Sequence, residues 1–291
     1  MIELNPIIKG ALVANAASLG VHWIYNSSYL ESLSKHQDLL FLKQSKAIFD
    51  QGKPSYYVYP NTEVGGHTLQ GMFLLWLYKA LKDNLNLSRE DYEQLIFEAL
   101  KPGGSYEGYV ESYAKRLIVK KLTFELKIPY DEEKLIDHHL VGFMPYLACR
   151  ALNLSIDRAW ELAQAFTTLE DYPKFYQMFD FIFEMIEKKP LPLVLKDAIA
   201  FAPEVYHYAL NQALVMTDTH QFIKDYAGIA CYLPQSIPLI FYILAHSNTY
   251  DDAIQFNARL GGASSDRGLL IGAILAQKYD IPKSWIEKTA F

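Results

Sequence analysis

Polar residues that could bind a ligand or take part in acid–base chemistry gather in the stretch Asn257–Gly268, "NARLGGASSDRG". Two glycines, two serines and the pair Asp266 and Arg267 stand there between two apolar helical patterns. Glycine commonly ends a helix, and Ser264, Ser265 or Asp266 could accept hydrogen bonds from the free N–H groups of the next helix. Capping accounts for part of this composition, whereas a binding site would account for all of it.

Two other glycine-bearing junctions place small or polar residues beside an expected helix. They are Gly10–Asn26, "GALVANAASLGVHWIYN", and Glu63–Gln70, "EVGGHTLQ". In the second junction, Thr68 is placed to cap the helix that follows. Taken alone, each junction is explained by ordinary capping. A functional site is favoured only if the three junctions converge in the fold.

The composition is that of a globular protein with a large core. Of 291 residues, 51% are hydrophobic and 21% charged, and the net charge of -6 argues against a broad surface for nucleic acid or acidic membranes. The two cysteines, Cys149 and Cys231, are most simply buried reduced thiols, so we expect a cytoplasmic protein. The longest apolar stretch, Ile237–Ala245, is too short to cross a bilayer and predicts a buried core helix.

Apolar residues recur at helical spacing almost throughout the chain, without a convincing run of alternating strands. Ser88 and Ser155 are typical N-cap residues. We therefore predict an all-α fold, with residues 1–291 forming one domain. The clearest helical segments are Gly71–Leu81, Asp91–Leu100, Ile156–Phe166 and Phe175–Glu187.

The segment Asp50–Gly66 has no helical stripe and contains Pro, Gly and three tyrosines. Long irregular loops in compact domains are often functional. An aromatic-rich surface loop that packs on its own side chains explains this segment equally well.

The stretch Thr249–Trp285, "TYDDAIQFNARLGGASSDRGLLIGAILAQKYDIPKSW", resembles the C-terminal signature of the ADP-ribosylglycohydrolase family. "GALVANAASLG", "GGHTLQGMFLLWLYKAL" and "YAGIACYLPQSIPLIFYIL" are similar, in the same order, to further family segments. The resemblance implies a single all-helical domain. It also implies hydrolysis of the N- or O-glycosidic bond of ADP-ribose, with two magnesium ions held by carboxylates and threonine.

Most of the acidic residues that this resemblance implies as magnesium ligands are replaced here. Thr68 is kept, but the other matching positions hold Asn15, Gly66, His67, Ala263, Ser264, Ser265 and Asp266. Losing most carboxylates removes the charge that dehydrates and holds two divalent ions, so we expect no metal cofactor. The chain therefore resembles the metal-poor, crystallin J1-like branch of the family. A weak or open metal site at His67, Thr68 and Asp266 is an alternative, since three such donors are too few for a closed zinc site.

The helix N-termini at Thr68 and Ser265 would face one cleft if the family fold is shared. Their free N–H groups, with Arg267 nearby, favour a small anionic ligand such as a phosphate; alternatively, Arg267 turns outward to a surface acid. Glu63 and Asp266 are the candidates for residual acid–base catalysis. The predicted ligand-binding residues are Asn15, His22, His67, Thr68, Asp137, His138, Ser264, Ser265 and Arg267.

These predictions leave several functions open. The first is binding of an ADP-ribose-like or other anionic ligand, with magnesium-dependent hydrolysis reduced or absent. An alternative is an active hydrolase with a non-standard site. The second is a non-catalytic structural or interaction protein, as the crystallin-like resemblance suggests.

Overall fold

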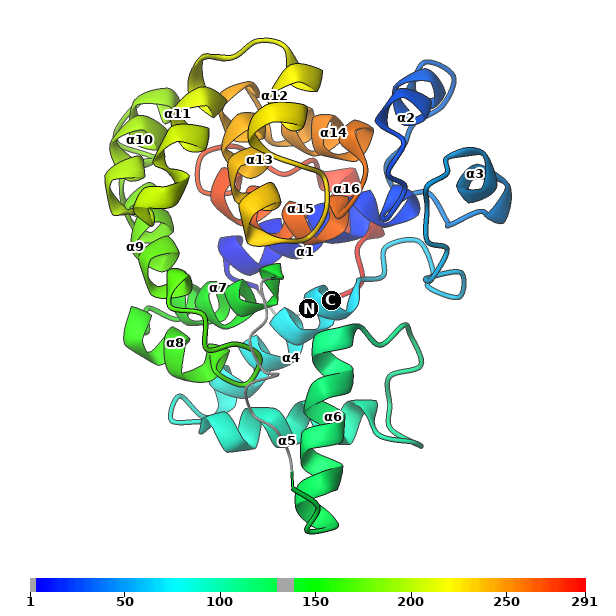
Figure 1. The fold of residues 1–291 in the computed structure, drawn as a ribbon, viewed down its shortest axis with the longest axis vertical. Helices are drawn as coiled ribbons and strands as arrows, with labels where there is room; N and C mark the ends of the chain where they lie inside the picture. Colours follow the sequence, from blue (N-terminus) through cyan, green and yellow to red (C-terminus); the bar gives the residue numbers. More distant parts are fainter. Residues whose placement is uncertain (1–3, 130–138) are drawn as a thin grey trace.

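The computed structural model describes residues 4–129 and 139–291, and within them it contains helices and no strand (Figure 1). The all-α prediction is confirmed. The α-helices are α1 Pro6–Ser18, α2 Ser27–Ser34, α3 Lys46–Gln51, α4 Leu69–Asp83, α5 Arg89–Leu100, α6 Ser112–Glu125, α7 Phe143–Ala151, α8 Ile156–Ala163, α9 Asp171–Met185, α10 Leu191–Ala198, α11 His207–Val215, α12 Thr219–Tyr226, α13 Leu233–Ala245, α14 Tyr250–Leu260, α15 Ser264–Leu275 and α16 Lys283–Lys288. The short 3-10 helices are η1 Leu19–Val21, η3 Leu140–Gly142, η4 Ile199–Phe201 and η5 Glu204–Tyr206.

Helices α1 and α15 lie side by side at the centre of the fold and run antiparallel (Figure 1). Glycine makes their close approach possible, because a Cβ atom at Gly10 would stand 2.3 Å from the Gly272 carbonyl oxygen. Helices α4, α7, α14 and α16 also pack against α1. The small-residue pattern of α1 and α15 therefore serves to bring the two ends of the chain together in the core.

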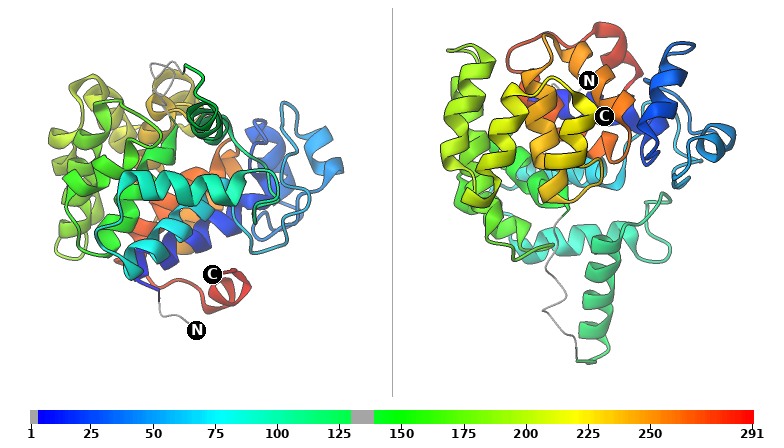
Figure 2. Two further views of the ribbon diagram at one scale, coloured as in Figure 1. Left: turned by 90° about the horizontal axis from the view of Figure 1, so that it is seen from below. Right: turned by 45° about the horizontal axis from the view of Figure 1, so that its top comes forward.

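The outer helices surround this pair. Figure 2 shows that α6 projects beyond the other helices, next to α5, while α9, α10 and α11 cover a different side. The apolar stretch Ile237–Ala245 lies within α13 and is almost entirely buried, as predicted for a core helix. Across the part of the chain that is described, no helix has the length and apolarity needed to span a membrane.

Several predicted N-caps are confirmed. Ser88 accepts a hydrogen bond from the Asp91 N–H at the start of α5, and Ser155 and Thr68 cap α8 and α4 in the same way. The prediction for the third junction is wrong, since α15 begins at Ser264 after Ala263, which has no capping side chain. The polar residues of that junction therefore lie inside the first turn of α15, where their side chains are available for other contacts.

Candidate functional site

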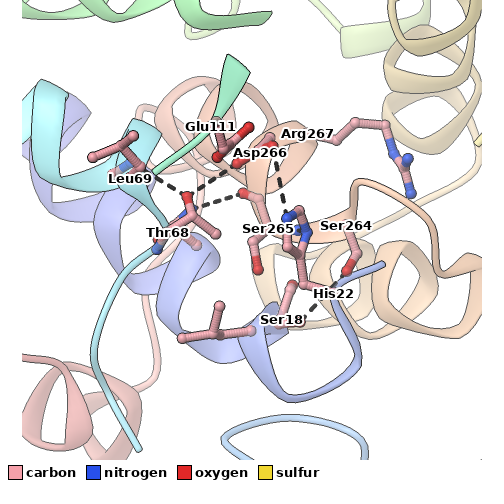
Figure 3. A network of polar contacts seen from close by, with 12 residues as sticks. Ser18, His22, Thr68, Leu69, Glu111, Ser264, Ser265, Asp266 and Arg267 are labelled. Carbon is pink, nitrogen blue, oxygen red and sulfur yellow. Dashed lines mark hydrogen bonds and ion pairs between the residues drawn. The ribbon is translucent and has the colours of Figure 1, made fainter. Parts of the chain in front are cut away.

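The three glycine-bearing junctions converge on one buried cluster of polar side chains (Figure 3). The Asn15 Nδ2 of α1 donates to Thr68 Oγ1 at 2.9 Å and to the Ser265 carbonyl oxygen at 3.1 Å. The Thr68 hydroxyl donates to Asp266 Oδ1 at 3.0 Å. The starts of α4 and α15 are thus joined through the middle of α1, and all four residues are fully buried.

The Thr68 hydrogen bonds have a defined direction. The Thr68 N–H donates to Asn15 Oδ1 at 3.1 Å, so the Asn15 amide nitrogen is the group that faces Thr68 Oγ1 and donates to it. The Gly71 N–H at 3.4 Å also donates to this oxygen. With its lone pairs used, the Thr68 hydroxyl directs its hydrogen to Asp266, whose Oδ1 is held as an acceptor.

His22 takes the place of a side-chain cap on α15. Its Nδ1 accepts the Ser265 N–H at 3.2 Å, and its Nε2 lies 3.8 Å from Asp266 Oδ2. Burial, followed by the charge of Arg267, lowers the pKa of His22 to about 3, so the ring is neutral near pH 7. Because Nδ1 is an acceptor, the ring proton is on Nε2 and faces the Asp266 carboxyl group.

Asp266 is an unusual acid because it lies in the interior. Burial raises its pKa to about 7, against the opposing effects of the Thr68 hydrogen bond and of His139 and Arg267. A carboxyl group with such a pKa exists in both protonation states near neutral pH. It can therefore accept or donate a proton, as acid–base catalysis requires.

A second buried acid, Glu111, was not predicted from the sequence. It immediately precedes α6, is 4% exposed, and lies next to Asp266 in Figure 3. Burial and the charge of Asp266 raise the pKa of Glu111 well above its usual range. The Tyr59 hydroxyl donates to Glu111 Oε1 at 3.2 Å and accepts the Leu69 N–H at 3.3 Å. Glu111 is thereby connected to the start of α4.

Three polar atoms of this cluster have no hydrogen-bond partner within the described residues. They are Ser265 Oγ, His22 Nε2 and Asp266 Oδ2, and each belongs to a fully buried residue. Buried polar groups in proteins are nearly always hydrogen-bonded, so each exception requires an explanation. Three exceptions in one cluster are typical of a place where a polar ligand or ordered water is bound.

Arg267 adopts neither of the two predicted arrangements. It is fully buried instead of turned outward, and Figure 3 shows its side chain extending away from Asp266. The guanidinium group donates to Asn257 Oδ1 at 3.2 Å and to the carbonyl oxygens of Ile229 and Gly261 at 2.8 and 2.6 Å. These bonds hold the turn before α15, which explains why a cation can be buried there.

Two other predicted residues lie at the edge of the cluster. His67 is buried, with Nδ1 3.3 Å from Asn15 Oδ1 and Nε2 2.6 Å from the Ala290 carbonyl oxygen. Burial lowers its pKa to about 4, so it is neutral and connects the cluster to the end of the chain. The Ser264 hydroxyl donates to the Ser18 carbonyl oxygen at 3.4 Å and so supports the α1–α15 contact.

The structure places Glu63 outside the cluster. Its side chain is 79% exposed and forms an ion pair with Lys43 at 2.7 Å. A catalytic role at the buried cluster would need a carboxyl group in reach of it, and Glu111 has that position instead. The predicted ligand-binding residues Asp137 and His138 lie outside the described residues.

The cluster is poor in metal donors. Within residues 4–129 and 139–291, no group of three or more His, Cys, Asp or Glu side chains is arranged to hold a metal ion. Asn15 and Thr68 are hydrogen-bonded to each other and to Asp266. Asp266 and Glu111 are the two carboxyl groups that the described part of the chain brings to this place.

The arrangement of the helices is that of an ADP-ribosylglycohydrolase-type fold. A solved structure described as an ADP-ribosylglycohydrolase-related protein complex matches 98% of this chain and 93% of its own, with a TM-score of 0.64 and 13% identity. Crystallin J1A of Tripedalia cystophora is 22% identical over 316 residues, covering 97% of this chain and 90% of the crystallin. No family model matches the chain. The resemblance inferred from the sequence is therefore confirmed at the level of the fold.

Proposed function

We propose that the protein binds an ADP-ribose-like ligand where α1, α4 and α15 meet, and that magnesium-dependent hydrolysis is reduced or absent. The observation that carries this proposal is the set of three unpartnered polar atoms on Ser265, His22 and Asp266. They belong to residues from two of the three converging junctions. The ADP-ribosylglycohydrolase-type fold supports the same class of ligand.

The chemistry of these atoms favours the hydroxyl-bearing part of the ligand. Ser265 Oγ and His22 Nε2–H can donate hydrogen bonds, and Asp266 Oδ2 can accept one, as a sugar with vicinal hydroxyl groups requires. A phosphate fits this place less well, because Arg267 is directed to other partners and His22 already accepts the Ser265 N–H. We therefore assign the ribosyl hydroxyl groups to the cluster and the phosphates to a position outside it.

The same donors are unsuited to two magnesium ions. Magnesium needs several oxygen ligands in nearly ideal octahedral geometry and gives up its water reluctantly. Asp266 and Glu111 have raised pKa values, and Thr68 and Asn15 are hydrogen-bonded to each other. We infer that the family's metal site is degenerate in this chain and that any residual hydrolysis proceeds without magnesium.

Residual hydrolysis would rely on the two buried acids. Cleavage of a glycosidic bond needs a group that protonates the leaving atom and a group that activates water. Asp266 and Glu111 supply two carboxyl groups with raised pKa values, so one can carry the proton while the other is ionised. Under this alternative function, the protein is a slow hydrolase with a non-standard site.

Isothermal titration with ADP-ribose tests the proposal. We expect binding of equal affinity in EDTA and in millimolar magnesium, and a loss of about ten-fold or more in Asp266→Ala, because each lost hydrogen bond to a charged group is worth roughly 1.5 to 3 kcal/mol. Glu63→Gln is the matched control and should bind like the original protein. Absence of binding at millimolar ADP-ribose would overturn the proposal. Turnover that depends strongly on magnesium would overturn the inference about the metal site.

A non-catalytic structural role is the second candidate, and the similarity to Crystallin J1A favours it. Under this function, ordered water satisfies the three polar atoms of the cluster. The same titration separates the two functions, since a structural protein gives no heat of binding while remaining folded by circular dichroism.

A further inference from the structure

The end of α16 and the residues after it lie across the start of α4. The Ala290 N–H donates to the Gly65 carbonyl oxygen at 2.9 Å, and His67 Nε2 lies 2.6 Å from the Ala290 carbonyl oxygen. A Cβ atom at Gly65 would stand 1.8 Å from the Lys288 carbonyl oxygen, so this approach requires a glycine. We call residues 288–290 the strap.

The strap lies at the surface, whereas the side chain that it contacts is buried. Ala290 is exposed, and His67 is only 5% exposed. Helix α16 is held separately by Trp285, whose ring meets the rings of Phe41 and Tyr250. Displacement of the strap would therefore uncover His67 while the packing of α16 through Trp285 is kept.

The orientation of the Asn15 amide follows from its partners. Its Nδ2 faces the Ser265 carbonyl oxygen, which needs a donor, and its Oδ1 faces the Thr68 N–H, which needs an acceptor. Exchanging the two atoms of the amide would break both hydrogen bonds. Asn15 Oδ1 is therefore an acceptor, and His67 Nδ1 lies 3.3 Å from this same oxygen.

The ring of His67 thus lies between two acceptors. Burial lowers the pKa of His67 to about 4, so the ring has a single N–H near pH 7. The Ala290 carbonyl oxygen, at 2.6 Å, requires this hydrogen on Nε2. Nδ1 then has no hydrogen, and its contact with Asn15 Oδ1 is not a hydrogen bond. Asn15 Oδ1 is left to accept the Thr68 N–H.

Without the strap, the other tautomer of His67 forms more hydrogen bonds. Water can donate to Nε2 as well as accept from it, so this nitrogen no longer requires the hydrogen. A hydrogen on Nδ1 would instead be donated to Asn15 Oδ1, and this oxygen would then have a second donor besides the Thr68 N–H. The strap therefore decides which nitrogen of His67 carries the hydrogen.

We propose that the strap positions Thr68 and Asp266 for ligand binding by selecting the Nε2–H tautomer of His67. With this tautomer, Asn15 holds the Thr68 main chain through Oδ1 and the Thr68 hydroxyl through Nδ2. The hydroxyl hydrogen then points to Asp266 Oδ1. His67 is a positioning residue, because it acts on Asp266 through Asn15 and Thr68. The effect on the ligand rests on the proposed function, whereas the choice of tautomer does not.

Nitrogen-15 NMR of the protein labelled at histidine tests the choice of tautomer, because a ring nitrogen with a hydrogen and one without have different chemical shifts. The signals of His67 are identified by their absence in His67→Gln. We expect the Nε2–H tautomer near pH 7 in the original protein. Gly65→Ala should change it to Nδ1–H, because the new Cβ displaces the strap. Gly103→Ala is the matched control, since φ is positive there and no atom lies within 4 Å of the new Cβ.

Calorimetric titration of two His67 variants with ADP-ribose tests the effect on the ligand. The long side chain of His67→Gln can donate to the Ala290 carbonyl oxygen, as the Nε2–H tautomer does. The shorter side chain of His67→Asn places its amide near Asn15, as the Nδ1–H tautomer does. We expect about five-fold tighter binding in His67→Gln than in His67→Asn, which corresponds to roughly one hydrogen bond. Equal affinities would overturn the positioning role.

The two measurements have separate outcomes. An Nδ1–H tautomer or a doubly protonated His67 ring in the original protein would overturn the proposal, as would an unchanged tautomer in folded Gly65→Ala. If Gly65→Ala does not fold, the spectrum of the original protein and the two His67 variants still decide the question. The expected tautomers in a protein that does not bind ADP-ribose would support the effect of the strap on His67 while overturning the proposed function.

Discussion

Asp266 and Arg267 are neighbours in the sequence and are both fully buried, but their surroundings differ. Each nitrogen of the Arg267 side chain donates to an oxygen of Asn257, Ile229 or Gly261. Asp266 has one carboxyl oxygen bonded to Thr68, while the other is without a hydrogen bond among the described residues. The hydrogen-bond donors of Arg267 are thus all used within the fold, whereas Asp266 Oδ2 is available to bind a ligand.

The contrast explains the unusual composition of "GGASSDRG". Arg267 and the glycines hold the turn before α15 in its conformation. Ser265 and Asp266, in contrast, face the polar cluster. Natural proteins commonly retain incompletely satisfied groups at functional sites, at a cost in stability. Substitution of Arg267 or of a glycine should therefore lower the stability of the fold, whereas substitution of Asp266 should raise it.

The largest effect is expected for Arg267→Ala. The substitution leaves Asn257 Oδ1 and the Gly261 carbonyl oxygen without a donor, removes one of the two donors to the Ile229 carbonyl oxygen and opens a void, which should destabilise the fold by about 4 kcal/mol. Urea unfolding followed by circular dichroism measures the change. Arg259→Ala, at the partly exposed end of α14, is the matched control and should cost about 1 kcal/mol or less. Equal losses in the two variants would remove the structural role assigned to Arg267.

Gly262→Ala should have the next largest effect. A Cβ atom there would lie 1.9 Å from the Ile229 carbonyl oxygen, and the φ of 58° is unfavourable for alanine. We expect the free energy of unfolding to fall by about 3 kcal/mol, because of both the steric clash and the unfavourable backbone conformation. Gly103→Ala separates the two causes, because φ there is 81° and no atom lies within 4 Å of the new Cβ. The free energy of unfolding of this control should fall by only about 1 kcal/mol, which is the cost of the backbone conformation alone.

Asp266→Asn should stabilise the protein at alkaline pH. The folded pKa of about 7 lies above the model-peptide value of 3.8, so the folded state binds the proton more tightly. The contribution of this proton to stability is complete below pH 4 and is lost as the pH rises to 7. Asparagine imitates the protonated acid, so the variant should match the original protein only below the unfolded pKa, and its advantage in stability should grow by about 2.5 kcal/mol between pH 5 and pH 8.

The comparison between the two proteins cancels the titrating groups that do not interact with Asp266, whereas Glu111, whose pKa is raised by the charge of Asp266, contributes to the difference. His22, whose folded pKa is about 3, lowers the stability of both as the pH falls below 6.5. Thermal unfolding of both proteins between pH 5 and pH 8 therefore isolates the effect of Asp266 and of its interaction with Glu111. A difference that does not change with pH would mean that the buried carboxyl is ionised throughout, contrary to this account.

The smallest effect is expected for Glu63→Gln. Glu63 is exposed and pairs with Lys43 at the surface, and such pairs contribute about 0.5 kcal/mol or less. Neither unfolding in urea nor ADP-ribose binding should change measurably. A loss of binding by more than about ten-fold would restore Glu63 as a functional residue and would weaken the assignment of Glu111.

Local patterns predicted much of the fold. Helical periodicity and the caps at Ser88, Ser155 and Thr68 depend on residues within one turn, and the structure confirms them. These features are encoded over short distances, where spacing alone is informative.

The missed features depend on contacts between distant residues. His22 accepts the Ser265 N–H across 243 positions of sequence, and Glu111 is buried by packing against Tyr59, 52 positions earlier. Arg267 has its three partners in two loops and a helix, so its direction could not be read from the neighbouring Asp266. No local pattern distinguishes such side chains from surface residues of the same type.

A crystal structure with ADP-ribose and magnesium both present would show whether the buried polar cluster binds the ligand without a pair of metal ions. We expect ribosyl hydroxyl groups within hydrogen-bond distance of Ser265 Oγ, His22 Nε2 and Asp266 Oδ2, with Arg267 still bound to Asn257, Ile229 and Gly261. We also expect no pair of octahedral magnesium ions beside Thr68 and Asp266. Two ordered magnesium ions there, or ligand density at Arg267 with the cluster left to water, would contradict these expectations.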